Sequence, residues 1–118
     1  MSKLAIVLDC GATNVRAIAV DEVGNIVAAA GAANAPASHP EGLIWDIEEL
    51  WGKLAGACRE VCSKVPTGEI AAVTCTTFGA DGAPVSAAGE LTYPLISWAD
   101  DRRTAELAKR VAGGVGAV

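Results

Sequence analysis

The sequence lacks the histidine and cysteine spacings from which zinc sites are built. Its only histidine, His39, lies in a proline-flanked segment, and no two of its cysteines form a C-x-x-C pair. Because zinc sites need several thiolate or imidazole ligands at short spacing, this pattern argues against one. Cys58 and Cys62 stand one helical turn apart, where we expect them to act as small buried apolar groups.

Positive charge and long apolar runs are also scarce. The 118 residues carry a formal net charge of −5 with an isoelectric point near 4.7, so no basic stripe is available for a nucleic-acid backbone. No apolar run approaches the roughly 20 residues that span a bilayer, and residues 1–3 lead directly into an apolar segment rather than a secretory leader. We therefore expect a cytoplasmic protein without nucleic-acid or membrane partners, in which backbone amides can still hold small anions.

Apolar segments near the start predict a sheet. Hydrophobic residues make up 52% of the chain, enough for the core of one ordinary domain. The continuous apolar run at residues 4–8 predicts a strand covered on both faces, and residues 15–20 and 26–30 predict two more. Short polar turns at residues 10–14 and 21–25 join these strands, so the opening is predicted to be an antiparallel meander.

A helix is predicted after a loose stretch at residues 36–42. Asp46 is a suitable N-cap, and Glu49 follows three residues later in a capping-box pattern. The apolar residues that follow recur at intervals of three and four, as on one face of a helix. Gly52 and Gly56 weaken that helix by about 1 kcal/mol each relative to alanine, unless they permit a close approach to the sheet.

The second half of the chain predicts one more strand, a hairpin and a helix. Residues 70–76 follow the first helix and are predicted to run parallel to the first strand. Residues 83–86 and 91–97 flank a turn and predict a small hairpin. The last helix is expected from Asp101 to about Ala112, and residues 113–118 should fray.

Polar residues are concentrated at the first turn of the meander. Gly11 lets an anion approach without a Cβ in the way, and both Gly11 and Asn14 are able to take positive φ. Thr13 and Asn14 add donors, and Arg16 adds a fixed charge. Asp9, at the end of the first strand, can anchor a hydrated Mg²⁺ that bridges phosphate oxygens. These residues predict a nucleotide-triphosphate site, with an ordinary hairpin turn as the alternative.

Three segments resemble the N-terminal part of the FGGY carbohydrate kinases, and among these the L-fuculokinases. They are LDCGATNVRAIAV at residues 8–20, TTFGADGAPV at residues 76–85 and YPLISW at residues 93–98. The first resembles a phosphate motif of the wider actin-like ATPase superfamily, and the other two are similar to sugar-kinase segments. The resemblance implies an α/β fold of the actin-like, or ribonuclease H-like, ATPase type. Residues 1–118 would then form its incomplete N-terminal domain, a mixed sheet with an antiparallel meander, a helix and a parallel strand.

The resemblance also implies roles for single residues. It places Asp9 where the family has its Mg²⁺-associated carboxylate. The nucleotide phosphates would be contacted by Gly11, Ala12, Thr13, Asn14 and Arg16. The sugar would be contacted by Gly79, Asp81, Trp98 and Arg103. Trp98 has an alternative role as a plug at the base of the second hairpin.

The segment SWADDRRT at residues 97–104 leaves two choices open. Either Asp100 or Asp101, and either Arg102 or Arg103, would face the substrate. A solvated helix start is the alternative for all four, because charged residues are common in a first turn.

The function that the resemblance implies is phosphorylation of a ketose by ATP with Mg²⁺, most closely of L-fuculose to L-fuculose 1-phosphate. The alternatives are a kinase for L-rhamnulose or xylulose, and a non-catalytic actin-like nucleotide-binding module. In the family the general-base aspartate lies beyond the position of Val118, so no catalytic residue is assigned here. We expect these residues to need the remainder of a kinase chain as partner and to be inactive alone, and the oligomeric state is left open.

Overall fold

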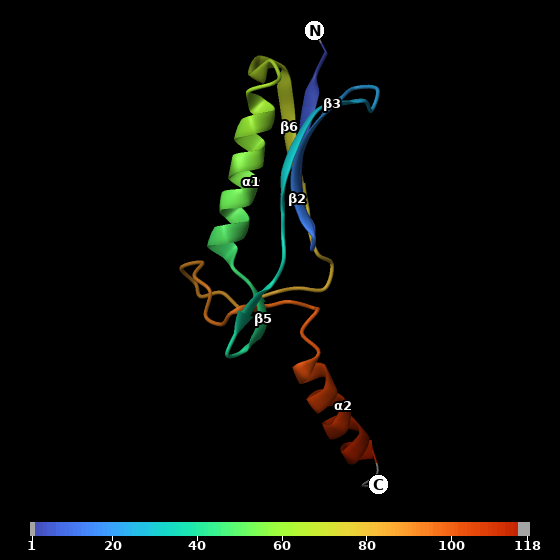
Figure 1. Ribbon diagram of the computed structural model, residues 1–118, viewed down its shortest axis with the longest axis vertical. Coiled ribbons are helices and arrows are strands. Elements are labelled where there is room, and N and C mark those ends of the chain that lie inside the picture. Colours follow the sequence, from blue (N-terminus) through green and yellow to red (C-terminus); the bar gives the residue numbers. More distant parts are fainter. Residues whose placement is uncertain (1, 116–118) are drawn as a thin grey trace. The chain divides into compact units, whose positions relative to one another are not determined.

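The structure is a computed structural model that describes residues 2–115, except for the side chains of residues 102–104, 107, 114 and 115. The chain divides into two compact units, each described by itself (Figure 1). Unit 1 comprises residues 1–35 and 46–79, and unit 2 comprises residues 36–45 and 80–118. In the described part of the chain, no helix has the length and apolarity that crossing a membrane requires.

Unit 1 contains a four-stranded sheet in the order β3-β2-β1-β6. Its strands are β1 (Leu4–Cys10), β2 (Asn14–Asp21), β3 (Ile26–Ala33) and β6 (Ile70–Thr76). The first three pair antiparallel, and β6 pairs parallel with β1. Both the predicted meander and the predicted parallel strand are therefore confirmed.

Helix α1 (Ile47–Cys62) begins as its cap predicts. The side chain of Asp46 accepts a hydrogen bond from the backbone N–H of Glu49 at 3.0 Å. The Glu49 carboxylate pairs with Lys53 one turn later at 2.6 Å. A short 3₁₀ helix, η1 (Thr67–Glu69), then leads into β6.

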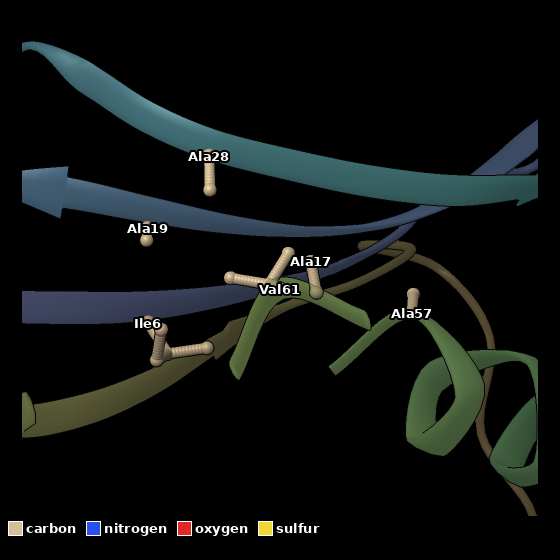
Figure 2. Packing of buried hydrophobic residues seen from close by; sticks show 6 residues of the cluster. All are labelled: Ile6, Ala17, Ala19, Ala28, Ala57 and Val61. Atoms are coloured by element: carbon tan, nitrogen blue, oxygen red, sulfur yellow. The ribbon is translucent and has the colours of Figure 1, made fainter. Parts of the chain in front are cut away.

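The core of unit 1 lies between α1 and one face of the sheet. Figure 2 shows its members, which are Ile6, Ala17, Ala19, Ala28, Ala57 and Val61. Ile6, Ala19 and Ala28 form one row across β1, β2 and β3. Because two of these three side chains are single methyl groups, the helix can pack close to the sheet, and the resulting core is thin.

The two glycines of α1, Gly52 and Gly56, are not needed for the close packing of the helix against the sheet. A Cβ added at Gly52 or Gly56 would meet nothing within 4 Å. Neither glycine is needed for packing in unit 1, so the expected weakening of α1 applies to both.

Unit 2 contains a small antiparallel sheet that the sequence did not predict. Its order is β4-β5-β7, with β4 (Ala37–His39), β5 (Gly42–Trp45) and β7 (Leu95–Ile96). The expectation of a loose stretch at residues 36–42 was wrong, because β4 and β5 form a hairpin. Gly42 has a φ of 138° at the point where β5 begins, a value that favours glycine.

The predicted second hairpin forms, but it is shorter than expected. Only one bridge, between Val85 and Leu91, forms there, and Gly89 takes a φ of 81° in its turn. Residues 95 and 96 pair instead with β5 as β7. Helix α2 (Arg102–Val115) extends three residues beyond the expected end at about Ala112, and the rest of the tail expected to fray, residues 116–118, lies outside the described residues.

Candidate functional site

The β1–β2 turn, residues 10–14, is closed by one hydrogen bond of its own. The backbone N–H of Gly11 donates to the carbonyl oxygen of Asn14 at 2.9 Å. Neither Gly11 nor Asn14 takes the positive φ that is open to it, because in the described residues only Gly24, Gly42 and Gly89 have positive φ. Glycine is required at position 11 for another reason, since a Cβ there would lie 2.7 Å from the Asn14 oxygen.

Two backbone donors of this turn are free. The N–H groups of Ala12 and Thr13 have no hydrogen-bond partner in the part of the chain that the structure describes. Thr13 and Asn14 are exposed, and the Asn14 amide donates to the Thr13 hydroxyl at 3.3 Å. The turn thus offers neighbouring backbone and side-chain donors, a combination that suits an anion.

Asp9 and Arg16 are brought together beside this turn. They stand opposite each other in the β1–β2 pairing, and Arg16 donates to Asp9 Oδ2 from Nη2 at 2.6 Å and from Nε at 3.2 Å. The Arg16 side chain is 57% exposed and that of Asp9 is 23% exposed. The pair therefore places one carboxylate and one guanidinium at the end of β1, within reach of solvent.

Gly31 makes room for this arginine. It pairs with Arg16 across β2 and β3, and a Cβ at Gly31 would lie 3.0 Å from Arg16 Cγ and 2.5 Å from the Val15 carbonyl oxygen. The stem of Arg16 therefore passes over a bare backbone, which a larger residue at position 31 would obstruct.

Asn34 is a site residue that the sequence analysis missed. It follows β3, is 8% exposed, and contacts the turn twice. Its backbone N–H donates to the Thr13 oxygen and its Nδ2 donates to the Gly11 oxygen, both at 2.9 Å. Its Oδ1 accepts from Lys53 Nζ of α1 at 3.2 Å. The only sequence signal was a single amide residue between the alanines that end β3 and Pro36.

Cys10, in the same turn, is not poised for nucleophilic chemistry. Burial raises the pKa of its thiol above the ordinary value of 9.0, and the negative charge of Asp9 adds to the rise. A side-chain hydrogen bond with Thr77 opposes these two effects without cancelling them. The thiol is therefore protonated at neutral pH and acts as an apolar group of the sheet.

In unit 2, Asp81 anchors two tryptophans. Its Oδ2 accepts from the indole Nε1 of Trp45 at 2.5 Å, and its Oδ1 accepts from the backbone N–H of Trp98 at 2.9 Å. Trp45 is 2% exposed, whereas Trp98 is 63% exposed. The Trp98 side chain therefore does not plug the hairpin, and its indole is open to solvent.

The remaining residues predicted on the sugar side differ in their exposure to solvent. Gly79 is exposed, and a Cβ there would meet nothing within 4 Å. Asp100 is 6% exposed and accepts a hydrogen bond from the Leu43 N–H, whereas Asp101 is exposed. Arg103 belongs to α2, and its side chain lies outside the described residues, as does that of Arg102.

Unit 2 also has a pocket beside these aspartates. Its volume is about 280 Å³, and it is lined by Ser38, His39, Gly42, Leu43, Asp100 and Asp101. Within the described residues, no three His, Cys, Asp or Glu side chains are grouped so that they could hold a metal ion.

The sequence from residue 4 to residue 114 matches the family described as the FGGY family of carbohydrate kinases, N-terminal domain. The chain belongs to the FGGY family. This family membership confirms the resemblance found in the sequence, which depended on the β1–β2 turn and on two later segments.

Curated relatives of this FGGY chain include two bacterial L-fuculokinases. The chain is 47% identical over 103 residues to the L-fuculokinase of Salmonella typhi, and the match covers 85% of this chain. It is 42% identical over 106 residues to the L-fuculokinase of Escherichia coli (strain K12), covering 87% of this chain. In both comparisons the chain spans only 22% of the relative's length.

Solved structures show the same fold. The gluconate kinase from Lactobacillus acidophilus superposes with a TM-score of 0.81 over 97% of this chain and 23% of that one, at 19% identity. The Plasmodium falciparum glycerol kinase, solved with ADP, gives a TM-score of 0.68 over 94% of this chain and 23% of that one, at 18% identity. The FGGY chain thus has the N-terminal part of the actin-like ATPase fold, which confirms the predicted fold class.

Proposed function

We propose that these residues are the N-terminal segment of an ATP-dependent kinase that converts L-fuculose to L-fuculose 1-phosphate. Membership of a carbohydrate kinase family supports the reaction class, and 42–47% identity to L-fuculokinases supports the sugar. The observation that carries the proposal is the β1–β2 turn. Its free N–H groups at Ala12 and Thr13 lie in the same turn that Asp9 and Arg16 flank.

The residues of this turn fit the phosphates of ATP. Gly11 keeps the turn narrow, the two free amides are ready donors, and Arg16 supplies a positive charge. Phosphoryl transfer depends on holding the γ-phosphate in position and neutralising its charge. In this proposal Gly11, Ala12, Thr13, Asn14 and Arg16 supply that positioning.

Asp9 fits the hydration shell of a magnesium ion. Its Oδ2 is occupied by Arg16, whereas its Oδ1 has no hydrogen-bond partner in the described part of the chain. Mg²⁺ usually keeps several waters and binds proteins through one or two carboxylates, so one free carboxylate oxygen suits it. When bound, the ion would neutralise charge on the phosphate oxygens.

Asp81 and Trp98 are proposed to face the sugar. Each oxygen of Asp81 accepts one protein N–H, and a carboxylate oxygen has a second lone pair for a sugar hydroxyl. The exposed indole of Trp98 presents a flat apolar surface beside it. Gly79 and Arg103 are also proposed to contact the sugar.

The test is an ATP-dependent phosphorylation assay of the complete protein that carries this sequence, with L-fuculose, L-rhamnulose and D-xylulose compared at equal concentrations. We expect the highest kcat/KM with L-fuculose, measured by ADP release and confirmed by mass spectrometry of the product. A higher kcat/KM with another ketose would show that L-fuculose is not the preferred substrate, while the proposed kinase reaction would stand. Nucleotide binding without turnover on any sugar would favour a non-catalytic nucleotide-binding module and contradict the proposal.

A further inference from the structure

We propose that Asn34 and Lys53 are positioning residues that orient the β1–β2 turn toward its nucleotide. The inference rests on the proposed function, because it concerns the same turn. Neither residue belongs to the turn, and neither is needed to contact ATP. Asn34 acts through the backbone of Gly11 and Thr13, and Lys53 acts through Asn34.

The argument begins with the carbonyl groups of the turn. Within the turn, the described backbone groups make one hydrogen bond to each other, from the Gly11 N–H to the Asn14 oxygen. The oxygens of Gly11 and Thr13 are both held by Asn34, one by its side chain and the other by its backbone. A single residue following β3 therefore fixes two of the peptide groups that make up the turn.

Holding the Gly11 oxygen also sets the direction of the Ala12 N–H. These two groups belong to one planar trans peptide unit, in which the C=O and the N–H point in opposite directions. Because Asn34 binds the Gly11 oxygen, the Ala12 N–H points away from Asn34, and it has no other partner in the described residues. The contact thus turns one of the free donors outward.

Lys53 determines which way the Asn34 amide lies. An ammonium group donates only, so it requires the oxygen Oδ1, and the NH₂ group of Asn34 is left for Gly11. Lys53 is held in turn by Glu49, one turn earlier in α1, at 2.6 Å. With Asn34 8% exposed and the Lys53 side chain 21% exposed, water has little access to break this chain of contacts.

The chain offers a matched control at the other end of α1. Lys64 also forms an ion pair with the glutamate four residues before it, Glu60, at 2.8 Å, but this pair does not involve Asn34. Lys64 lies just after the end of α1, but Lys53→Met and Lys64→Met both remove an ion pair to a glutamate of α1 four residues earlier, and only the first removes the bond to Asn34. Lys53→Arg keeps a donor and serves as the rescue.

The experiment measures kcat, KM for Mg·ATP and KM for L-fuculose in the complete protein. We expect Asn34→Asp, which replaces the donor to Gly11 by a second acceptor, to lower kcat/KM for Mg·ATP about tenfold or more, since misplaced reacting groups lose rate steeply. Lys53→Met should lower it about threefold, and Lys53→Arg should restore most of the loss. KM for L-fuculose should stay within about twofold in all variants, because in the described part of the chain none of its proposed residues forms a hydrogen bond or ion pair with Asn34 or Lys53.

Three outcomes decide the inference. An unchanged kcat/KM for Mg·ATP in a folded Asn34→Asp variant would overturn it. Equal increases in KM for Mg·ATP and in KM for L-fuculose would overturn it as well. If Asn34→Asp does not fold, the two lysine variants provide the test. Equal values of kcat/KM for Mg·ATP in Lys53→Met and Lys64→Met would then overturn the inference. An inactive wild-type protein would refute the proposed function instead. The positioning role would then be judged by amide hydrogen exchange at Gly11 and Asn34, whose N–H groups donate to Asn14 and Thr13. This exchange must be faster in Lys53→Met than in Lys64→Met.

Discussion

Arg16 donates two hydrogen bonds to a single oxygen of Asp9 across the β1–β2 pair, at 2.6 and 3.2 Å to Oδ2. This geometry holds the guanidinium beside the turn and leaves Asp9 Oδ1 without a partner in the described residues. One pair of facing residues thereby places a positive charge beside a free carboxylate oxygen, as the proposed binding of a magnesium–nucleotide complex requires. Gly31 supports this pair by leaving space under the arginine stem.

The first prediction concerns Asp9. Asp9→Asn removes the charge that would attract the hydrated magnesium ion, so we expect kcat with Mg·ATP to fall by about a hundredfold or more. The variant should fold, because asparagine has nearly the same volume and can still accept from Arg16. Glu60→Gln, on the exposed side of α1, is the control and should leave kcat unchanged. An Asp9→Asn enzyme with wild-type turnover would exclude a role for this carboxylate.

The second prediction separates glycines that are needed from those that are not. Gly52→Ala should raise the free energy of unfolding by about 1 kcal/mol, because the added Cβ meets nothing within 4 Å and alanine favours the helix. Gly31→Ala should lower it, because its Cβ would lie 2.5 Å from the Val15 oxygen. Urea denaturation of both variants measures the difference. Shifts of the same sign would contradict this account of the packing.

The parts of the fold that the sequence predicted depend on local signals. The run of branched apolar residues in β1 indicates a central strand. Asp46 caps α1 by accepting a hydrogen bond from the N–H of Glu49, only three positions away. The β4–β5 hairpin gave no such signal, because strands of three and four residues are too short to show a period and prolines lie beside them. The pairing of β7 with β5 joins residues about fifty positions apart, which no local pattern specifies.

Two features of the candidate site's geometry could not be predicted from the sequence. Gly11 was singled out because it leaves an anion's path free of a Cβ, whereas the structure shows a local constraint: an added Cβ would lie 2.7 Å from the Asn14 oxygen. Asn34 was missed because its partner Gly11 lies 23 positions away in the sequence. A pairing partner of that kind becomes visible only when the strand order is known.

The third prediction concerns the Trp45–Asp81 hydrogen bond. Trp45→Phe keeps most of the buried apolar surface but removes the indole N–H, so Asp81 Oδ2 loses a partner. We expect KM for L-fuculose to rise about fivefold or more, with KM for Mg·ATP changed less than about twofold. Trp51→Phe, at a 64% exposed position on α1, is the matched control. Equal effects of the two substitutions would contradict a sugar-side role for Asp81.

The fourth prediction is a pH dependence of thiol labelling. Because burial raises the pKa of Cys10 above 9.0, its thiolate, the reactive form, should become populated only at more alkaline pH. With iodoacetamide at pH 8, exposed Cys75 should be labelled first and Cys10 last, as read by mass spectrometry of peptides. Because the thiol ionises at a lower pH in the unfolded state than in the native state, the free energy of unfolding should fall as the pH rises past 9.0. Rapid labelling of Cys10 at pH 8 would show that the β1–β2 turn is more open than described.

The account depends most on the claim that the β1–β2 turn binds the phosphates of ATP. The most direct measurement is a crystal structure of the complete protein with Mg²⁺ and a non-hydrolysable ATP analogue. We predict a phosphate oxygen within about 3.2 Å of the backbone nitrogen of Ala12 or Thr13, with Arg16 beside it. A triphosphate bound elsewhere, with both amides facing solvent or protein, would contradict the account.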